Sequence, residues 1–96
     1  MIELTIGQIA SAVSGSIFRG SPEATISGAV QTDSREITKG GVFVAKLGEK
    51  EDGHKYVVDA LLSGATLAIV SEPLPDVEID QVVVKDTIVA LNSLAE

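Results

Sequence analysis

The chain has 96 residues, of which 45% are hydrophobic but only 3% aromatic, so one small domain with an aliphatic core is expected. Its formal net charge of −7 argues against a general nucleic-acid-binding protein, because binding to phosphates needs a positive field. The absence of cysteine excludes disulfides and thiolate metal sites.

The N-terminal segment predicts a short helix and no targeting signal. Met1–Thr5 lacks a basic segment followed by an apolar stretch, and no apolar run approaches the roughly 20 residues that span a bilayer. A soluble protein without membrane insertion is therefore expected. Thr5 and Gln8 have the spacing of a capping box, which predicts a helix over residues 5–14 with Gly15 in the left-handed position that ends it.

Short strands are predicted next. Ser16–Arg19 and Ala24–Thr32 read as the first two strands, and Asp33–Gly41 as a loop. Val42–Ala45 is a compact apolar run of strand length. The polar segment 47–53 is expected to be an exposed loop.

The second half alternates helices with strands. The helices and strands expected here cover residues 56–62, 66–70, 81–84 and a final helix after Asp86. Gly64 suits the end of the first of these helices, and Asp86 can cap the last. This alternation predicts an α/β fold, with residues 1–96 as a single small domain containing a mixed sheet of about five short strands and about three helices. The last helix has no C-terminal signal before Glu96, so the chain is expected to be a fragment of a longer protein.

Motifs for catalysis are absent from the sequence. It contains neither the Gly-x-x-x-x-Gly-Lys-Ser/Thr loop that binds ATP phosphates nor the dinucleotide-binding glycine pattern. With one histidine and no cysteine, no spaced set of metal ligands is evident. A catalytic triad could be composed of Ser34, His54 and either Asp33 or Asp52, but no local sequence motif supports it. No catalytic residue and no metal site are therefore expected in this chain.

Two polar clusters remain as candidate binding sites. The first is Gln31–Arg35, where short side chains can fold back on the backbone and Arg35 offers a planar donor fork for phosphate or carboxylate. Composition alone favours a plain turn there. The second is Gly48–Lys55, where two glycines allow a ligand to approach the backbone, although a solvated surface loop explains it at least as well.

The distribution of charge and the order of the strands bring these clusters together. Five of the seven Lys and Arg residues lie between Arg35 and Lys55, so this part of the chain is the expected place for an anion, if the domain binds one. Both clusters follow predicted strands and are expected at the same end of one sheet, where α/β folds commonly bind ligands.

Four short motifs occur in a fixed order, namely Thr32-Asp33-Ser34-Arg35, Gly41-Val42-Phe43-Val44-Ala45, Gly48-Glu49 and Asp52-Gly53-His54. By this ordered set, essentially the whole chain resembles the N-terminal domain of the Mur ligase family, in the members that make the later peptide additions. Met1–Ile6 and Val82–Thr87 fit the same pattern. They narrow the resemblance to the ligases that add D-alanyl-D-alanine.

The resemblance implies a domain that anchors the UDP end of a UDP-MurNAc-tripeptide substrate in peptidoglycan-precursor synthesis in the bacterial cytoplasm. ATP and Mg²⁺ would bind to a central ATPase domain of the same polypeptide, so this domain would itself hold no cofactor. Its partners would be that substrate and that central domain, not nucleic acid. The implied substrate-binding residues, none of them catalytic, are Thr32, Asp33, Ser34, Arg35, Gly48, Glu49, Lys50, Glu51, Asp52, Gly53 and His54.

The chain departs from the family pattern at three positions. Glu51 stands where an aromatic residue is frequent, Lys50 where arginine is common, and Lys46 where an apolar residue is usual. Two alternatives remain open. One is the same domain of the ligase that adds the third peptide residue to a UDP-MurNAc-dipeptide, and the other is a freestanding nucleotide-binding or interaction module without ligase activity.

Overall fold

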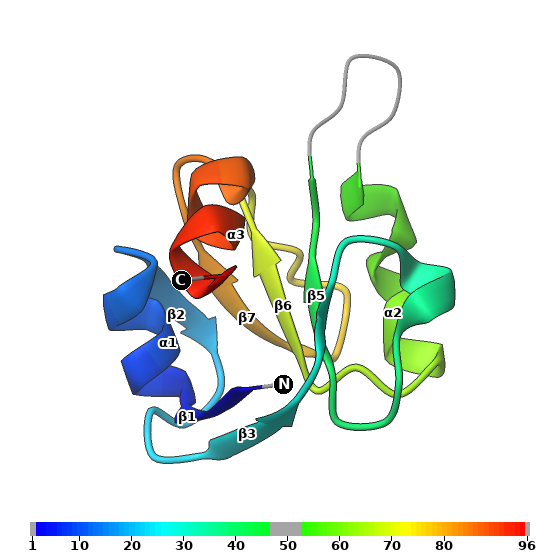
Figure 1. Cartoon of the computed structure of the whole chain (residues 1–96). Helices are drawn as coiled ribbons and strands as arrows, with labels where there is room; N and C mark the ends of the chain where they lie inside the picture. The colour runs from blue at the N-terminus through cyan, green and yellow to red at the C-terminus, as the bar shows by residue number, and fades with distance from the viewer. Residues whose placement is uncertain (1, 47–52, 96) are drawn as a thin grey trace.

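A computed structural model describes residues 2–46 and 53–95 (Figure 1). The described elements are, in chain order, β1 (Ile2–Thr5), α1 (Ile6–Ala12), β2 (Ser16–Arg19), β3 (Thr25–Gly28), β4 (Val30–Gln31), the 3₁₀ helix η1 (Ser34–Glu36), β5 (Val42–Val44), the 3₁₀ helix η2 (Gly53–Tyr56), α2 (Val57–Leu62), β6 (Leu67–Val70), β7 (Asp80–Val83) and α3 (Thr87–Ala95). The main sheet has the order β2-β7-β6-β5-β4, in which only β2 is antiparallel to its neighbour. The predicted α/β class, with a mixed five-stranded sheet and three helices, is confirmed.

The main sheet carries a hydrophobic core on each face. Alternate residues of a strand point to opposite sides, so Val42 and Leu67 pack on the side of α1 and α3, whereas Phe43 and Ala68 pack on the side of α2. All four side chains are completely buried. Figure 1 shows the same layers, with α1 and α3 together on one side of the sheet and α2 on the other. The ends of the strands, not the faces, are thus left for ligands.

The connection between the parallel strands β6 and β7 contains no helix, and a buried glutamine holds it in place. The Gln81 side chain is fully buried; its Oε1 accepts the Leu74 N–H at 2.8 Å, and its Nε2 donates to the carbonyl of Leu74 at 2.8 Å and that of Val77 at 3.2 Å. Leu74 and Val77 pack against the α2-side core. One amide therefore provides the hydrogen bonds that a crossover helix would otherwise make internally.

Helix α1 begins as predicted but ends differently. The capping box is present, with the Thr5 N–H donating to Gln8 Oε1 at 2.9 Å and the Gln8 N–H to Thr5 Oγ1 at 3.1 Å. The prediction of Gly15 as the left-handed residue is wrong, because Ser14 has that conformation, with φ of 55°. Gly15 instead lies against β7, where a Cβ would come within 2.8 Å of the Val83 carbonyl oxygen. Close packing, not backbone conformation, favours glycine there.

The N-terminal strand β1 was not predicted, and the strand expected over residues 24–32 is divided. Its first part, β3, pairs with β1 in a separate two-stranded sheet, whereas its second part, β4, pairs with β5 in the main sheet. The chain changes sheets at Ala29, whose carbonyl accepts the Val42 N–H at 2.9 Å. Gly28 touches the backbone of Gly40 and leaves no space for a Cβ. This close crossing of two backbone segments breaks the strand.

The remaining predicted elements are present within one or two residues of their expected bounds. Gly64 has a φ of +112° at the end of α2, and Asp86 Oδ1 accepts the Ile88 N–H at 2.8 Å at the start of α3. Across the described parts of the chain, every helix is too short or too polar to cross a bilayer.

Candidate functional site

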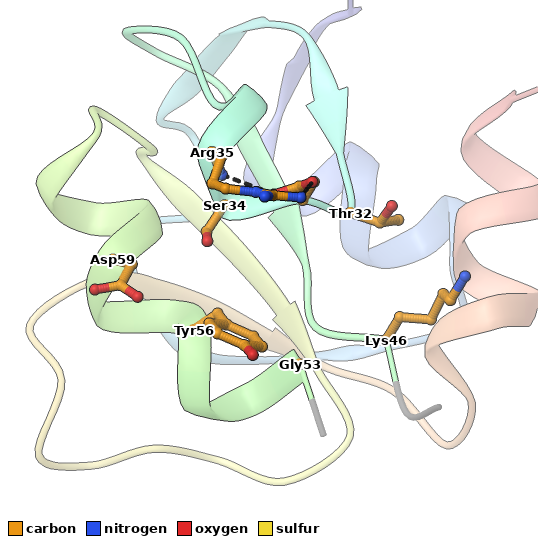
Figure 2. A pocket seen from close by; sticks show the side chains of 8 residues that line it. Thr32, Ser34, Arg35, Lys46, Gly53, Tyr56 and Asp59 are labelled. Atoms are coloured by element: carbon orange, nitrogen blue, oxygen red, sulfur yellow. Dashed lines mark hydrogen bonds and ion pairs between the residues drawn. The ribbon is translucent and has the colours of Figure 1, made fainter. Parts of the chain in front are cut away.

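An open pocket with a volume of about 650 Å³ lies beyond the ends of β4 and β5 (Figure 2). Its lining consists of Thr32, Asp33, Ser34, Arg35, Lys46, Gly53, Tyr56 and Asp59. Because β4, β5 and β6 run parallel, their carboxyl ends meet at the same edge of the sheet. This arrangement places Gly53, from the second polar cluster, beside Thr32–Arg35 from the first.

The turn after β4 is held by an ion pair between two pocket residues. Asp33 caps η1 by accepting the Arg35 N–H at 2.9 Å. Its carboxylate also accepts from the guanidinium, with Nε to Oδ1 at 3.1 Å and Nη2 to Oδ2 at 2.8 Å. In the free protein, the guanidinium nitrogens Nε and Nη2 of Arg35 are therefore already hydrogen-bonded to Asp33.

The ion pair changes how both of its members titrate. The Arg35 guanidinium, followed by the Arg35 backbone N–H, lowers the pKa of Asp33 from its ordinary 3.8 to about 2. The same carboxylate raises the pKa of Arg35. Since the pKa of Asp33 is lower in the folded state, the pair stabilises the fold at pH values above the ordinary pKa. This contribution is lost as the pH falls through about 2.

We expect the Asp33 carboxyl carbon to titrate with a midpoint near 2 in a ¹³C NMR pH series. In Arg35→Ala the midpoint should rise toward 3.8 without reaching it, because the backbone N–H of residue 35 still donates to the carboxylate. An Asp33 midpoint near 3.8 in the unaltered chain would contradict the ion pair.

Ser34 offers a hydroxyl directly to the pocket. The residue is 8% exposed, and in Figure 2 its side chain points into the pocket on the side of Asp59 and Tyr56. Within residues 2–46 and 53–95, no side-chain hydrogen bond of Ser34 is formed. The hydroxyl can both donate and accept, so it is available to a ligand.

Gly53 is the first residue of η2, and its backbone lies against that of Lys46, just beyond the end of β5. Its N–H donates to the Lys46 carbonyl at 2.8 Å, and a Cβ at this position would lie 2.7 Å from the Lys46 nitrogen. This contact holds the backbone of Lys46 on one side of the pocket. Gly53 also begins η2, whose last residue, Tyr56, lies on the other side of the pocket. Only glycine permits such a close approach of two backbone segments.

Three lining residues were not among the predicted site residues. Lys46 lies two residues beyond the end of β5, Tyr56 is the only tyrosine of the chain, and Asp59 lies on α2. Lys46 could have been identified from the sequence, because it comes shortly after a strand whose carboxyl end faces the pocket. Tyr56 and Asp59 could not, because both look like ordinary residues of an amphipathic helix.

His54 faces the neighbouring strand and does not line the pocket. Its Nε2 accepts the Ser71 N–H at 2.9 Å and lies 3.3 Å from Ser71 Oγ, which ties η2 to the end of β6. The predicted site residues Gly48, Glu49, Lys50, Glu51 and Asp52 lie outside the described residues. Their role stays a prediction.

The described lining of the pocket combines hydroxyl groups, two cationic and two acidic side chains and an aromatic ring. These groups suit the binding of an anionic ligand with a polar ring system. In the parts of the chain that the structure describes, no three His, Asp or Glu side chains are grouped to hold a metal ion.

Comparison with known proteins gives a consistent set of relatives. Residues 25–96 match the family described as "Mur ligase family, catalytic domain". The UDP-N-acetylmuramoyl-tripeptide–D-alanyl-D-alanine ligase of Escherichia coli (strain K12) is 39% identical over 95 residues, which are 99% of this chain and 20% of the relative. The UDP-N-acetylmuramoyl-L-alanyl-D-glutamate–2,6-diaminopimelate ligase of Cytophaga hutchinsonii is 39% identical over 71 residues, 70% of this chain and 14% of that relative.

Solved structures show the same fold. A crystal structure of MurF from Acinetobacter baumannii aligns with a TM-score of 0.85 and 36% identity, over 98% of this chain and 20% of that one. A MurF ligase from Thermotoga maritima, in complex with ADP, aligns with a TM-score of 0.63 and 28% identity over 73% of this chain and 16% of its own. The chain thus spans between 14% and 20% of the length of these proteins.

Proposed function

The chain belongs to the Mur ligase family, and on that premise we propose that it is the N-terminal domain that anchors the UDP end of a UDP-MurNAc-tripeptide. The parent enzyme would add D-alanyl-D-alanine to this substrate in the bacterial cytoplasm. The observation that most strongly supports this proposal is the pocket at the carboxyl ends of β4 and β5, where Thr32–Arg35 and Gly53 lie together. These are residues that the family resemblance assigns to the nucleotide.

The chemistry of the pocket fits a uridine diphosphate. The hydroxyls of Thr32 and Ser34 can form hydrogen bonds with the ribose or phosphate oxygens, and the cationic side chains attract the negatively charged diphosphate. The aromatic ring of Tyr56 offers an apolar surface for the base. We assign these residues to substrate positioning, because they would hold a part of the substrate that is remote from its reacting carboxylate.

The extent of the similarity favours D-alanyl-D-alanine addition over addition of the third peptide residue. The E. coli relative of the first kind aligns over 99% of this chain, whereas the C. hutchinsonii relative of the second kind aligns over 70% at the same identity. The freestanding module is disfavoured, since the relatives are about five times longer than this chain.

We place ATP and Mg²⁺ on a central ATPase domain of the parent polypeptide, outside these 96 residues. The sequence contains no phosphate-binding loop of the Gly-x-x-x-x-Gly-Lys-Ser/Thr type. The ADP complex of the T. maritima ligase, which is about six times longer than the aligned region, supports a nucleotide site in that family. The partners of this domain would then be the UDP-linked substrate and the central domain.

Replacing Ser34 with alanine should weaken UDP binding roughly fivefold, because one hydrogen bond from a hydroxyl contributes about 1 kcal/mol. Isothermal titration calorimetry of the 96-residue chain with UDP measures the effect. ADP, which carries the same diphosphate, should bind the unaltered chain more weakly than UDP does.

Ser27→Ala is the matched control, since Ser27 is an exposed serine on β3, away from the pocket. Its affinity for UDP should equal that of the unaltered chain. If the unaltered chain, Ser34→Ala and Ser27→Ala bound UDP with equal affinity, Ser34 would not be part of the binding site. Failure of the unaltered chain to bind UDP at millimolar concentrations would contradict the proposed function.

A further inference from the structure

The two cationic side chains of the pocket differ in whether they are already paired. Arg35 contacts the Asp33 carboxylate through two of its nitrogens. Lys46 is exposed, and none of the carboxylates in the described parts of the chain lies within 4.0 Å of its ammonium group. Lys46 is therefore the cation that a bound anion can engage without first displacing a carboxylate.

The backbone at Lys46 is held firmly although its side chain is exposed. The Lys46 carbonyl accepts the Gly53 N–H at 2.8 Å, and the preceding Ala45 N–H donates to the Ile69 carbonyl at 2.9 Å. Figure 2 shows the Lys46 side chain extending on the Thr32 side of the pocket, across from Asp59. The structure thus places one ammonium group on a defined wall of the pocket.

The charges of the lining residues show why this ammonium group matters. Asp33 and Asp59 are negative and Arg35 and Lys46 are positive, so the lining residues that the structure describes are together formally neutral. Without Lys46 the lining would carry a net negative charge, in a chain whose formal net charge is already −7. An anionic ligand would then meet repulsion from both the pocket and the whole protein.

We infer that Lys46 is the phosphate-binding cation of this pocket and contacts the diphosphate of a nucleoside diphosphate, with the Thr32 hydroxyl on the same wall. The nucleoside part of this inference rests on the proposed function. A lysine acts here as a point charge, so its contribution should grow with the charge of the ligand. Binding of uridine should not depend on it, whereas binding of UDP should depend on it strongly.

The test compares Lys46→Met, which removes the ammonium group and keeps an unbranched side chain, with Lys39→Met as the matched control. Lys39 is an exposed lysine close to Gly64, before β6, and therefore at the opposite edge of the sheet. Amide NMR titrations with uridine, UMP, UDP and inorganic pyrophosphate give the four affinities for each variant. Lys46→Met should lose roughly five- to tenfold in affinity for UDP, less for UMP and nothing for uridine.

The salt dependence adds a readout that a purely structural role would not change. Affinity of the unaltered chain and of Lys39→Met for UDP should fall as ionic strength rises, because salt screens exposed charges. The fall should be smaller in Lys46→Met, and Lys46→Arg should restore most of the affinity. Equal UDP affinities of Lys46→Met and Lys39→Met, or an equal loss for uridine and UDP, would overturn the inference.

The pyrophosphate and uridine titrations separate this inference from the proposed function. If uridine shifts the pocket amides but binding of pyrophosphate and UDP does not depend on Lys46, the inference is wrong and the proposed function stands. If pyrophosphate binds in a Lys46-dependent way and neither uridine nor the uracil of UDP contributes affinity, Lys46 is an anion-binding residue and the proposed uridine ligand is wrong.

Discussion

Replacing Gln81 with leucine should lower the free energy of unfolding by about 3 kcal/mol. The substitution leaves the Leu74 N–H and the Val77 carbonyl without their side-chain partner, whereas the Leu74 carbonyl still accepts the Val77 N–H at 3.1 Å. Each buried unpaired polar group costs about 1–3 kcal/mol. A chain of this length has a total stability of only roughly 5–14 kcal/mol. The melting temperature should therefore fall by about 15 °C or more, as measured by circular dichroism.

Gln8→Leu is the matched control for Gln81→Leu. Gln8 is exposed, and its side chain makes a single hydrogen bond, to the Thr5 N–H of the capping box. Its replacement should cost about 1 kcal/mol or less, because water can hydrate the released N–H. If the two variants had the same stability, Gln81 would not be holding the crossover between β6 and β7.

Replacing Gly53 with alanine should weaken UDP binding roughly tenfold and destabilise the fold by about 1–2 kcal/mol. The added Cβ would lie 2.7 Å from the Lys46 nitrogen and 2.8 Å from the Lys46 carbonyl oxygen. Both are backbone atoms two residues beyond the end of β5, so neither can be moved by a change of rotamer. Relief requires η2 and the end of β5 to move apart, which displaces Lys46 and Tyr56 on the two sides of the pocket.

Gly7→Ala is the control for a glycine-to-alanine change. A Cβ at residue 7 would lie 3.1 Å from the Pro22 carbonyl oxygen, and a shift of a few tenths of an ångström relieves that contact. The higher helix propensity of alanine offsets the cost by about 1 kcal/mol. UDP affinity, measured by calorimetry, should be unchanged in Gly7→Ala. An unchanged affinity in Gly53→Ala as well would mean that the junction with Lys46 does not shape the site.

The parts of the fold that local signals specify were predictable from the sequence. The capping box of Thr5 and Gln8, the aspartate before α3 and the apolar runs of β5 and β6 all depend on neighbouring residues. The division between β3 and β4 was not predictable, because it depends on Gly28 meeting Gly40 across the fold. The strand β1 was missed for the same reason, since its pairing partner lies about twenty residues away.

The candidate site was predicted in part. Parallel strand order places Thr32–Arg35 and Gly53 together, as the alternation of strands and helices indicated. The ion pair between Asp33 and Arg35 was not foreseen, although it determines which cation is open to a ligand. Tyr56 and Asp59 line the pocket because of how η2 and α2 are oriented relative to the strand ends. No local sequence pattern predicts that orientation.

The most direct test of the central claim is an amide NMR titration of the ¹⁵N-labelled chain with UDP. The largest shifts are expected at Thr32–Arg35, at Lys46 and across Gly53–Tyr56, with little change in α1 and in the sheet of β1 and β3. The absence of shifts, or shifts centred on α1, β1 or β3, would contradict the assignment of this pocket as the UDP site.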